Sequence, residues 1–243
     1  MSAAHIIGVL GVVALASLVQ GISGFGFSLM SMPLLSAFLG VEKSLAIQTA
    51  LGVLANAITA SRARHDVLRT TTVRIVAATV IGMPFGWIIL DHASPRTMKV
   101  IVGVTVSVMA ILLARGVQLR VSGTLVDAVS GFISGILSTS VGTNGPPLVI
   151  GLTGRQLPAA QQRATLSSCF MIGNTIVLIA LIVAGRFDRG TTIATIAALP
   201  MVLLTTLMGD RIFSRLRQHH YDRIVIVLLI ASGAIAVASA IAA

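Results

Sequence analysis

The sequence predicts an all-α polytopic membrane protein with two inverted repeats, each a broken, re-entrant helical hairpin followed by three transmembrane helices. Of its 243 residues, 56% are hydrophobic and only 10% are charged, whereas soluble domains carry about a quarter charged residues. Long apolar runs alternate with short basic loops, and two of these runs are interrupted by glycine and proline. Strands of a membrane barrel would alternate every second residue, so the runs indicate helices.

The chain is expected to form one transmembrane domain over residues 1–243, with repeat 1 at about 1–116 and repeat 2 at about 117–243. Equal residues recur at matching places in the two halves, which is typical of transporter repeats. The matches are Ile22-Ser23-Gly24 with Ile133-Ser134-Gly135, Pro33-Leu34 with Pro147-Leu148, Asn56 with Asn174, and Pro84 with Pro200.

The first interrupted run, at 5–40, is too long for one span of about 20 residues and rather short for two spans with a turn. Its break is the glycine cluster Gly21 to Ser28. Helices are then expected at 43–61, 73–90 and 98–114. In the second of these, Gly82 and Gly86 are four residues apart, which permits close helix approach, and Pro84 can kink the helix.

The second interrupted run, at 124–152, contains Ser138-Thr139-Ser140-Val141-Gly142-Thr143-Asn144-Gly145-Pro146-Pro147. Asn144 suits an N-cap, and the two prolines suit a first helical turn. Irregular backbone survives at membrane depth only when it is buried or lines a cavity. A helix N-terminus there offers unpaired N–H groups and a positive dipole end, which suit an anion. Spans at 163–184, 191–208 and 223–242 complete the chain.

The basic residues predict the orientation. If both interrupted runs cross the membrane, the loops divide the 17 Lys and Arg nine against eight, which decides nothing. If both are re-entrant hairpins, the loops near 62–74, 115–120, 155–163 and 211–223 hold twelve and the opposite side five. The positive-inside rule favours the second arrangement, in which the repeats are inverted and the hairpin tips meet in a central site.

The chain resembles the TauE/SafE family of sulfite exporter-like anion permeases over nearly its whole length. The similarity lies in Gly21-Ile22-Ser23-Gly24-Phe25-Gly26-Phe27 with Met32-Pro33-Leu34-Leu35, and in Gly131-Phe132-Ile133-Ser134-Gly135 with Gly142 to Val149. Family members usually carry denser glycine runs than these two. The resemblance implies transport of sulfite, sulfonates or related small organic anions across the inner or plasma membrane.

The candidate substrate-binding residues come from the two breaks and from polar side chains on the following spans. They are Gly24, Phe25, Gly26, Ser28, Gln48, Thr49, Asn56, Thr139, Ser140, Gly142, Thr143, Asn144, Gly145, Ser168 and Asn174. The hydroxyls could instead bond carbonyls of their own helix, and the amides could join helices without touching a ligand. No Lys or Arg falls in the middle of an expected span, so helix dipoles and hydroxyls would have to hold the anion.

Other functions are weighed against transport. The net charge of +10 is read as orientation of the spans, so no nucleic acid partner is expected. No residue cluster has metal-ligand spacing and no phosphate loop is present, so no metal or cofactor is expected. An intramembrane enzyme would need a base beside Cys169, and an assembly subunit would not need two polar breaks.

The predicted function is export of the anion as substrate, with the lipid bilayer and a possible homo-oligomer as partners. Ion-coupled uptake of the same anions is the alternative. Proton-coupled transporters commonly hold an acid within the membrane. The nearest here, Asp127, lies close to the end of a hairpin.

Overall fold

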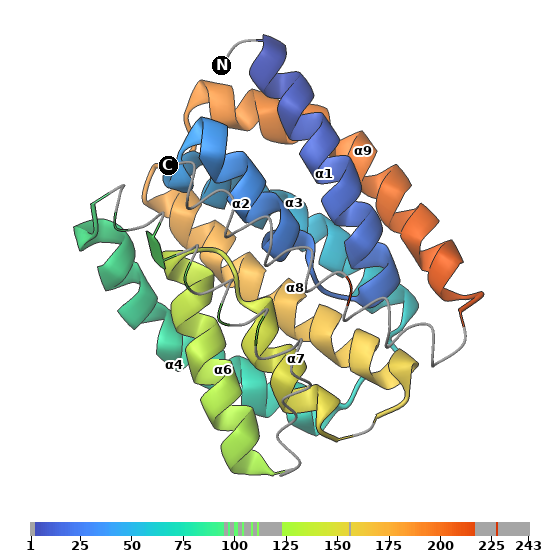
Figure 1. Cartoon of the computed structure of the whole chain (residues 1–243). Coiled ribbons are helices and arrows are strands. Elements are labelled where there is room, and N and C mark those ends of the chain that lie inside the picture. Colours follow the sequence, from blue (N-terminus) through green and yellow to red (C-terminus); the bar gives the residue numbers. More distant parts are fainter. Residues whose placement is uncertain are drawn as a thin grey trace.

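A computed structural model describes residues 3–94, 123–155 and 157–216, together with Thr97, Val100, Ile101, Val104, Val108, Ile111 and Val227. The helices are α1 (Ala3–Ser23), α2 (Phe27–Leu39), α3 (Val41–Arg62), α4 (Arg69–His92), α6 (Thr124–Ser140), α7 (Gly145–Thr153), α8 (Ala159–Val183) and α9 (Arg189–Phe213) (Figure 1). Five of them, α1, α3, α4, α8 and α9, are long and apolar enough to cross a membrane. The prediction of an all-α polytopic membrane protein is confirmed.

The helix bounds differ from the expected spans mainly by extension. The span expected at 73–90 is Arg69–His92, and the one expected at 191–208 is Arg189–Phe213. The span expected to begin at 163 begins at Ala159, so Arg163 lies inside a helix and not in a loop. Most of 98–114, and all of 223–242 except Val227, lie outside the described residues.

Both interrupted runs are broken where the sequence predicted. Gly24 and Gly26 have φ angles of 78° and 99°, and Gly142 has 68°, a left-handed region that glycine enters without the steric cost of a side chain. Asn144 takes the N-cap position of α7, and the two prolines lie in its first turn. The Asn144 side chain makes no capping hydrogen bond, so its amide is available for other contacts.

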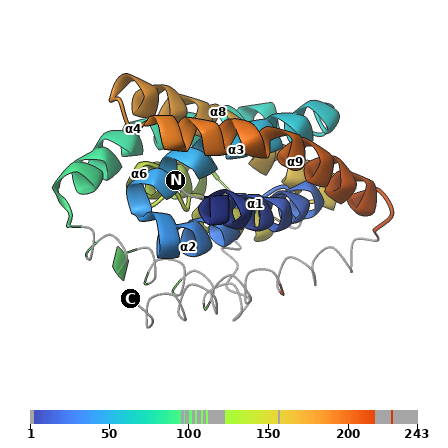
Figure 2. The same cartoon turned by 90° about the horizontal axis from the view of Figure 1, so that it is seen from above.

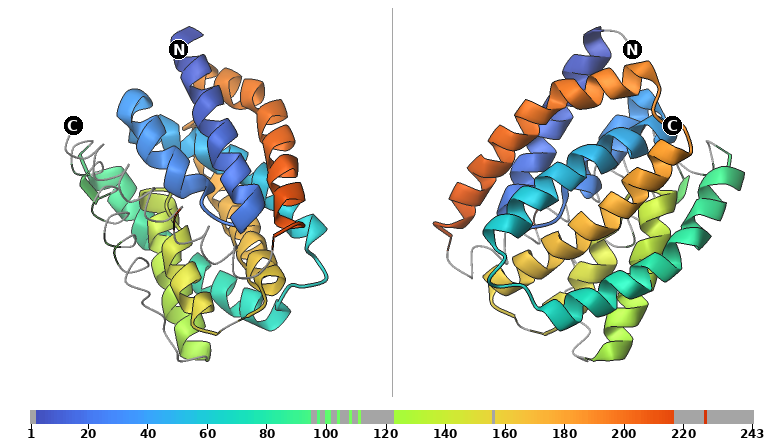
Figure 3. Two further views of the ribbon diagram at one scale, coloured as in Figure 1. Left: turned by 45° about the vertical axis from the view of Figure 1, so that its right-hand side comes forward. Right: turned by 180° about the vertical axis from the view of Figure 1, so that it is seen from behind.

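The helices form two layers. In one layer α9, α3, α8 and α4 lie side by side in that order, as Figure 3 shows from behind. The two broken runs form helical hairpins, α1–α2 and α6–α7, on one face of this layer (Figure 2). We call them hairpin 1 and hairpin 2, and their turns tip 1 (residues 24–26) and tip 2 (residues 141–144).

Each hairpin packs most extensively against the last described long helix of the other half of the chain. Among the described helices, α4 from the first half of the chain lies along α6, and α9 from the second half lies along α1. Glycine makes both contacts close: a Cβ at Gly86 would meet the carbonyl of Ile136, and one at Gly21 would meet that of Thr206. The close approach expected from Gly82 and Gly86 is confirmed.

The hairpins open toward opposite ends of the molecule. At the first end, His5 of α1 stacks on Phe38 of α2, with ring centroids 6.2 Å apart. At the second end, Asp127 of α6 forms an ion pair with Arg155, just beyond α7. We call these end 1 and end 2. End 1 also holds 40–43, 91–93 and 185–189, and end 2 also holds 62–74, 159–163 and 210–215.

Ion pairs connect the helices at end 1. The Lys43 ammonium lies 2.8 Å from the Asp188 carboxylate. This hydrogen bond, with a second one from the Thr191 N–H, holds the pKa of the Asp188 carboxyl well below its usual range. Asp188 is the N-cap of α9, with 2.6 Å between its Oδ1 and that N–H. The charge therefore fixes the start of α9 to the start of α3.

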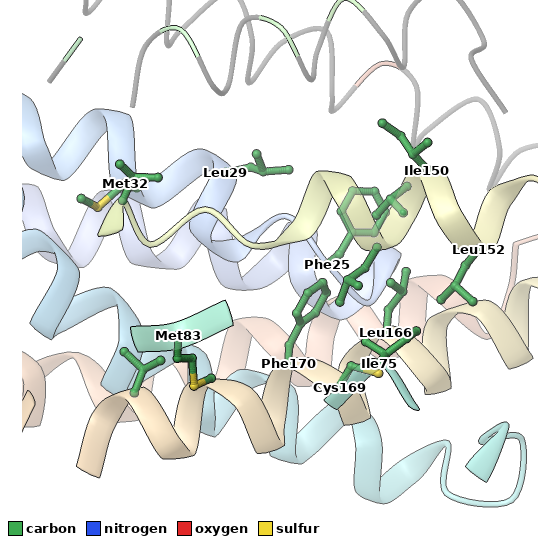
Figure 4. Close-up of a cluster of buried hydrophobic side chains, with 14 of the residues drawn as sticks. Phe25, Leu29, Met32, Ile75, Met83, Ile150, Leu152, Leu166, Cys169 and Phe170 are labelled. Atoms are coloured by element: carbon green, nitrogen blue, oxygen red, sulfur yellow. The ribbon is translucent and has the colours of Figure 1, made fainter. Parts of the chain in front are cut away.

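Buried apolar side chains fill the space between the hairpins and the four-helix layer. Phe25 of tip 1 is 1% exposed and Phe170 of α8 is 4% exposed. Figure 4 shows these two rings close together within one cluster of buried side chains. A Cβ at Gly145 would lie within 4.0 Å of both. The two tips therefore meet around the Phe25 ring.

Candidate functional site

A small cavity lies between the two tips. Its walls come from both hairpins and from the spans that follow them, and consist of Gln20, Gly26, Phe27, Ser28, Asn56, Asn144, Gly145, Phe170 and Asn174. The cavity measures about 10 Å³, about the room that a single water molecule needs. It is therefore a polar site that is closed in this conformation.

Two amide pairs form the polar wall of the cavity. Gln20 Nε2 donates to Asn56 Oδ1 at 2.7 Å, and Asn144 Nδ2 donates to Asn174 Oδ1 at 3.0 Å. In each pair an amide of a hairpin meets an asparagine of the next span, and Asn56 and Asn174 stand at matching places in the two halves of the sequence. Each half of the chain thus contributes the same kind of contact to the cavity wall.

The surrounding backbone holds these amides in place. Gln20 Oε1 accepts from the Phe27 N–H at 3.3 Å, which joins the two limbs of hairpin 1. Asn56 Nδ2 donates to the Gly52 carbonyl of its own helix at 2.7 Å. Ser134 Oγ donates to the Asn144 carbonyl at 2.9 Å, which joins the limbs of hairpin 2. The Asn174 side chain is only partly buried and faces the cavity.

Two helix N-termini converge on the cavity. The first residues of α2, Phe27 and Ser28, line one side, and the first residue of α7, Gly145, lines another. The N-terminus of a helix carries a partial positive charge and unpaired N–H groups. Prolines at 146 and 147 carry no N–H, so Gly145 supplies the donor of α7. None of the residues that line the cavity is titratable, so its electrostatics come from dipoles.

Six of the predicted site residues come together at this cavity: Gly26, Ser28, Asn56, Asn144, Gly145 and Asn174. The others lie around it. Gln48 donates to the Gly142 carbonyl at 3.1 Å and to Thr49 at 3.3 Å. It therefore holds the backbone of tip 2 without lining the cavity. Gly24, Phe25 and Ser168 are buried outside the cavity wall.

The hydroxyls of tip 2 behave in two ways. Thr139 donates to the Met83 carbonyl at 2.9 Å, and Ser140 to the Ile136 carbonyl at 2.6 Å. Both are therefore engaged with helix backbone. The Thr143 hydroxyl is buried and has no hydrogen-bond partner among the described residues, so it is available to a ligand or a water molecule.

Three lining residues were not predicted: Gln20, Phe27 and Phe170. Gln20 carried a signal, since it is an amide inside an apolar run, one turn before the first break. Nothing in the sequence separated the two phenylalanines from ordinary core residues. Among the residues that the structure describes, no group of three or more His, Cys, Asp or Glu could hold a metal ion.

Comparison with known proteins gives the family. The family model described as "Sulfite exporter TauE/SafE" matches residues 9–235. The "Probable sulfite/organosulfonate exporter TauE" of Cupriavidus necator is 26% identical over 203 residues, covering 79% of this chain and 78% of that protein. The "Probable inner membrane transporter protein TsaS" of Comamonas testosteroni is 32% identical over 107 residues, 44% of each chain. No solved structure matches. The chain belongs to the sulfite exporter TauE/SafE family and is a multi-pass membrane transporter rather than an enzyme.

Proposed function

We propose that this transporter exports a small sulfur-containing anion, sulfite or an organosulfonate, through the inner membrane and binds it in the cavity between the two tips. The observation that carries the proposal is the convergence of two helix N-termini on one cavity lined with amides. N–H groups and amide nitrogens donate to the oxygens of such an anion, and the two dipoles favour its charge. The printed names of the two relatives supply the substrate class and the membrane.

The cavity is too small for the proposed substrate. Space for about one water molecule does not admit a sulfur atom with three oxygens, so a tip must move for the anion to enter. Hairpin 1 opens toward end 1 and hairpin 2 toward end 2. In our proposal the two halves are inverted repeats, and separation of the tips exposes the same amides first to one end and then to the other.

The charges support export. Among the described residues, end 2 carries eight arginines, namely Arg62, Arg64, Arg69, Arg74, Arg155, Arg163, Arg211 and Arg215, and end 1 carries Lys43, Arg186 and Arg189. The positive-inside rule then assigns end 2 to the cytoplasm. A cytoplasm at negative potential drives an anion outward by about 2.3 kcal/mol per charge per 100 mV, which sustains about a fortyfold gradient. Export needs no coupling ion, whereas uptake of the same anion does.

The test is sulfite flux in proteoliposomes under a potassium diffusion potential, with pH and sodium equal on both sides. The proposal expects flux that follows the potential, and competition by methanesulfonate. Flux that appears only with a proton or sodium gradient would support ion-coupled uptake instead. Asn144→Ala, which removes one amide of the cavity, is expected to weaken flux, with Gly11→Ala on the exposed face of α1 as the matched control. Equal flux in both variants would place the site elsewhere.

A further inference from the structure

An arginine lies buried directly beside tip 1, on the side of end 2. Arg163 is 3% exposed. Its Nη2 donates to Asp210 Oδ1 at 2.7 Å and to the Gly21 carbonyl at 2.6 Å, and its guanidinium lies 4.3 Å from the centroid of the Phe213 ring. Taking both members of an ion pair out of water costs desolvation that their attraction need not repay, so the buried Arg163–Asp210 pair needs an explanation beyond stability.

The position of Arg163 connects it to the cavity. A Cβ at Gly24 would lie 2.5 Å from Arg163 Cγ, so tip 1 rests on the stem of this side chain. Ser167 donates both to the Gly24 carbonyl, at 3.2 Å, and to the Arg163 carbonyl, at 2.8 Å. The carbonyl that Arg163 holds belongs to Gly21, the neighbour of Gln20 in the cavity wall. Movement of Arg163 therefore affects the tip that closes the cavity.

Asp210 can release Arg163 without becoming an unpaired buried carboxylate. It also accepts from Arg62 Nη1 at 2.6 Å, and Arg62 is 52% exposed. After Arg163 leaves, the carboxylate keeps this second, water-accessible partner. Replacing the Asp210 carboxylate by another anion at Arg163 therefore costs less than breaking an isolated buried ion pair.

A corresponding cluster at end 1 has the opposite composition. There Arg186 donates to Glu42 at 2.6 Å and to Asp91 at 2.7 Å. Arg186 lies just after α8, as Arg62 lies at the end of α3, and Asp91 lies in the last turn of α4, as Asp210 lies in the last turn of α9. The described end 1 cluster holds two acids and one arginine, is 32–54% exposed, and repels a free anion. The described end 2 cluster holds two arginines and one acid, with Arg163 and Asp210 only 3% and 13% exposed.

We propose that Arg163 binds the transported anion on its path from end 2 to the amide cavity, and that Asp210 occupies the guanidinium between transport cycles. The inference rests on the proposed function and adds a binding residue to it. The fork of N–H groups on arginine suits two oxygens of a sulfite or sulfonate as well as two of a carboxylate. When the anion replaces Asp210, the ties from Arg163 to α9 and to hairpin 1 loosen, and tip 1 is free to move.

The experiment measures sodium sulfite binding by calorimetry on purified Arg163→Gln, Asp210→Asn and Arg186→Gln. Arg163→Gln is expected to weaken binding about tenfold to a hundredfold, the effect of a lost charged hydrogen bond. Asp210→Asn removes the competing charge and is expected to tighten binding. Arg186→Gln, the matched change at end 1, is expected to leave it unchanged.

Three results would overturn the inference. The first is that the Arg163→Gln variant folds and binds sulfite as tightly as the wild type. A second such result is that Asp210→Asn weakens sulfite binding as much as Arg163→Gln does. If the ion pair had only a structural role, removing either partner would weaken binding. If Arg163→Gln does not fold, Arg163→Lys retains the charge without the fork, and unchanged sulfite affinity in that variant would overturn it too. Failure of the proposed function is distinct, since the wild type itself would then not bind sulfite or methanesulfonate.

Discussion

Asn174→Asp is the sharpest test of the cavity between the tips. The change is almost isosteric, and Asn174 Oδ1 already accepts the hydrogen bond from Asn144, so the new carboxylate retains that contact. Among the residues that the structure describes, none accepts a hydrogen bond from the Asn174 amide nitrogen, so little is lost inside the protein. What changes is the side chain that faces the cavity: a neutral amide is replaced by a negatively charged carboxylate.

The expected magnitude follows from the distance at which a bound anion would lie. Two like charges about 4 Å apart repel by about 4 kcal/mol at an effective dielectric constant of 20, which corresponds to roughly a thousandfold weaker binding. Asn174→Ala removes one neutral acceptor and should cost only about 1 kcal/mol, or roughly fivefold. The two variants thus separate the effect of charge from that of a lost hydrogen bond.

The assay is sulfite binding and flux with the two purified variants, compared at matched thermal stability. We expect Asn174→Asp to abolish detectable binding, whereas Asn174→Ala should bind sulfite only roughly fivefold more weakly than the wild type. Equal sulfite affinity in Asn174→Asp and the wild type would refute the claim that the anion binds between the tips, since no nearby anion site could ignore an added charge.

Three further predictions concern packing, topology and pH. Gly86→Ala should lower the thermal unfolding temperature, because its Cβ would meet a carbonyl of α6, whereas Gly11→Ala, whose Cβ meets nothing, should not; equal shifts would contradict the close packing. Cysteines placed at Arg64 and at Arg215 should be labelled from one side only, the cytoplasmic side; labelling from opposite faces would exclude the hairpin arrangement. Because the folded pKa of Asp188 is lowered, its stabilising charge acts fully above the ordinary pKa of about 4 and is lost as the pH falls below it. The difference in thermal unfolding temperature between the wild type and Asp188→Asn should therefore be largest near pH 7 and shrink progressively as the pH falls from about 4, and an unchanged difference down to about pH 3 would contradict the assignment.

Sequence chemistry predicted the features that depend on local backbone. Clustered glycines allow positive φ angles, and adjacent prolines remove two N–H donors, so the breaks before Phe27 and before Gly145 could be found without a structure. The long apolar spans could also be predicted, because hydrophobic composition is a local property of the sequence. The ends of the spans were less certain, because a helix extends into polar residues when tertiary contacts support it.

The candidate site was only partly predictable, because its contacts join residues far apart in the chain. Gln20 meets Asn56 across 36 positions, and no local pattern encodes that pairing. A hydroxyl near a helix end can bond its own backbone or a ligand equally well, so Thr139 and Thr143 looked alike although only Thr139 is engaged. Arg163 was assigned to a loop because its burial depends on Asp210, in a different helix.

The packing of α1 against α9, near the far end of the chain, also limits the order in which the protein can be assembled. The main partner of α1 among the described helices is α9, and about 190 residues separate Ser23 from Phe213. At translation rates of about 5–20 residues per second, hairpin 1 waits on the order of 10–40 s for that surface to be synthesised. During this time the face of α1 around Gly21, whose backbone later lies against α9, contacts lipid or the insertion machinery. Severing the chain between α4 and α6 therefore separates each hairpin from the helix that packs on it most extensively, and only co-expressed halves should accumulate in the membrane.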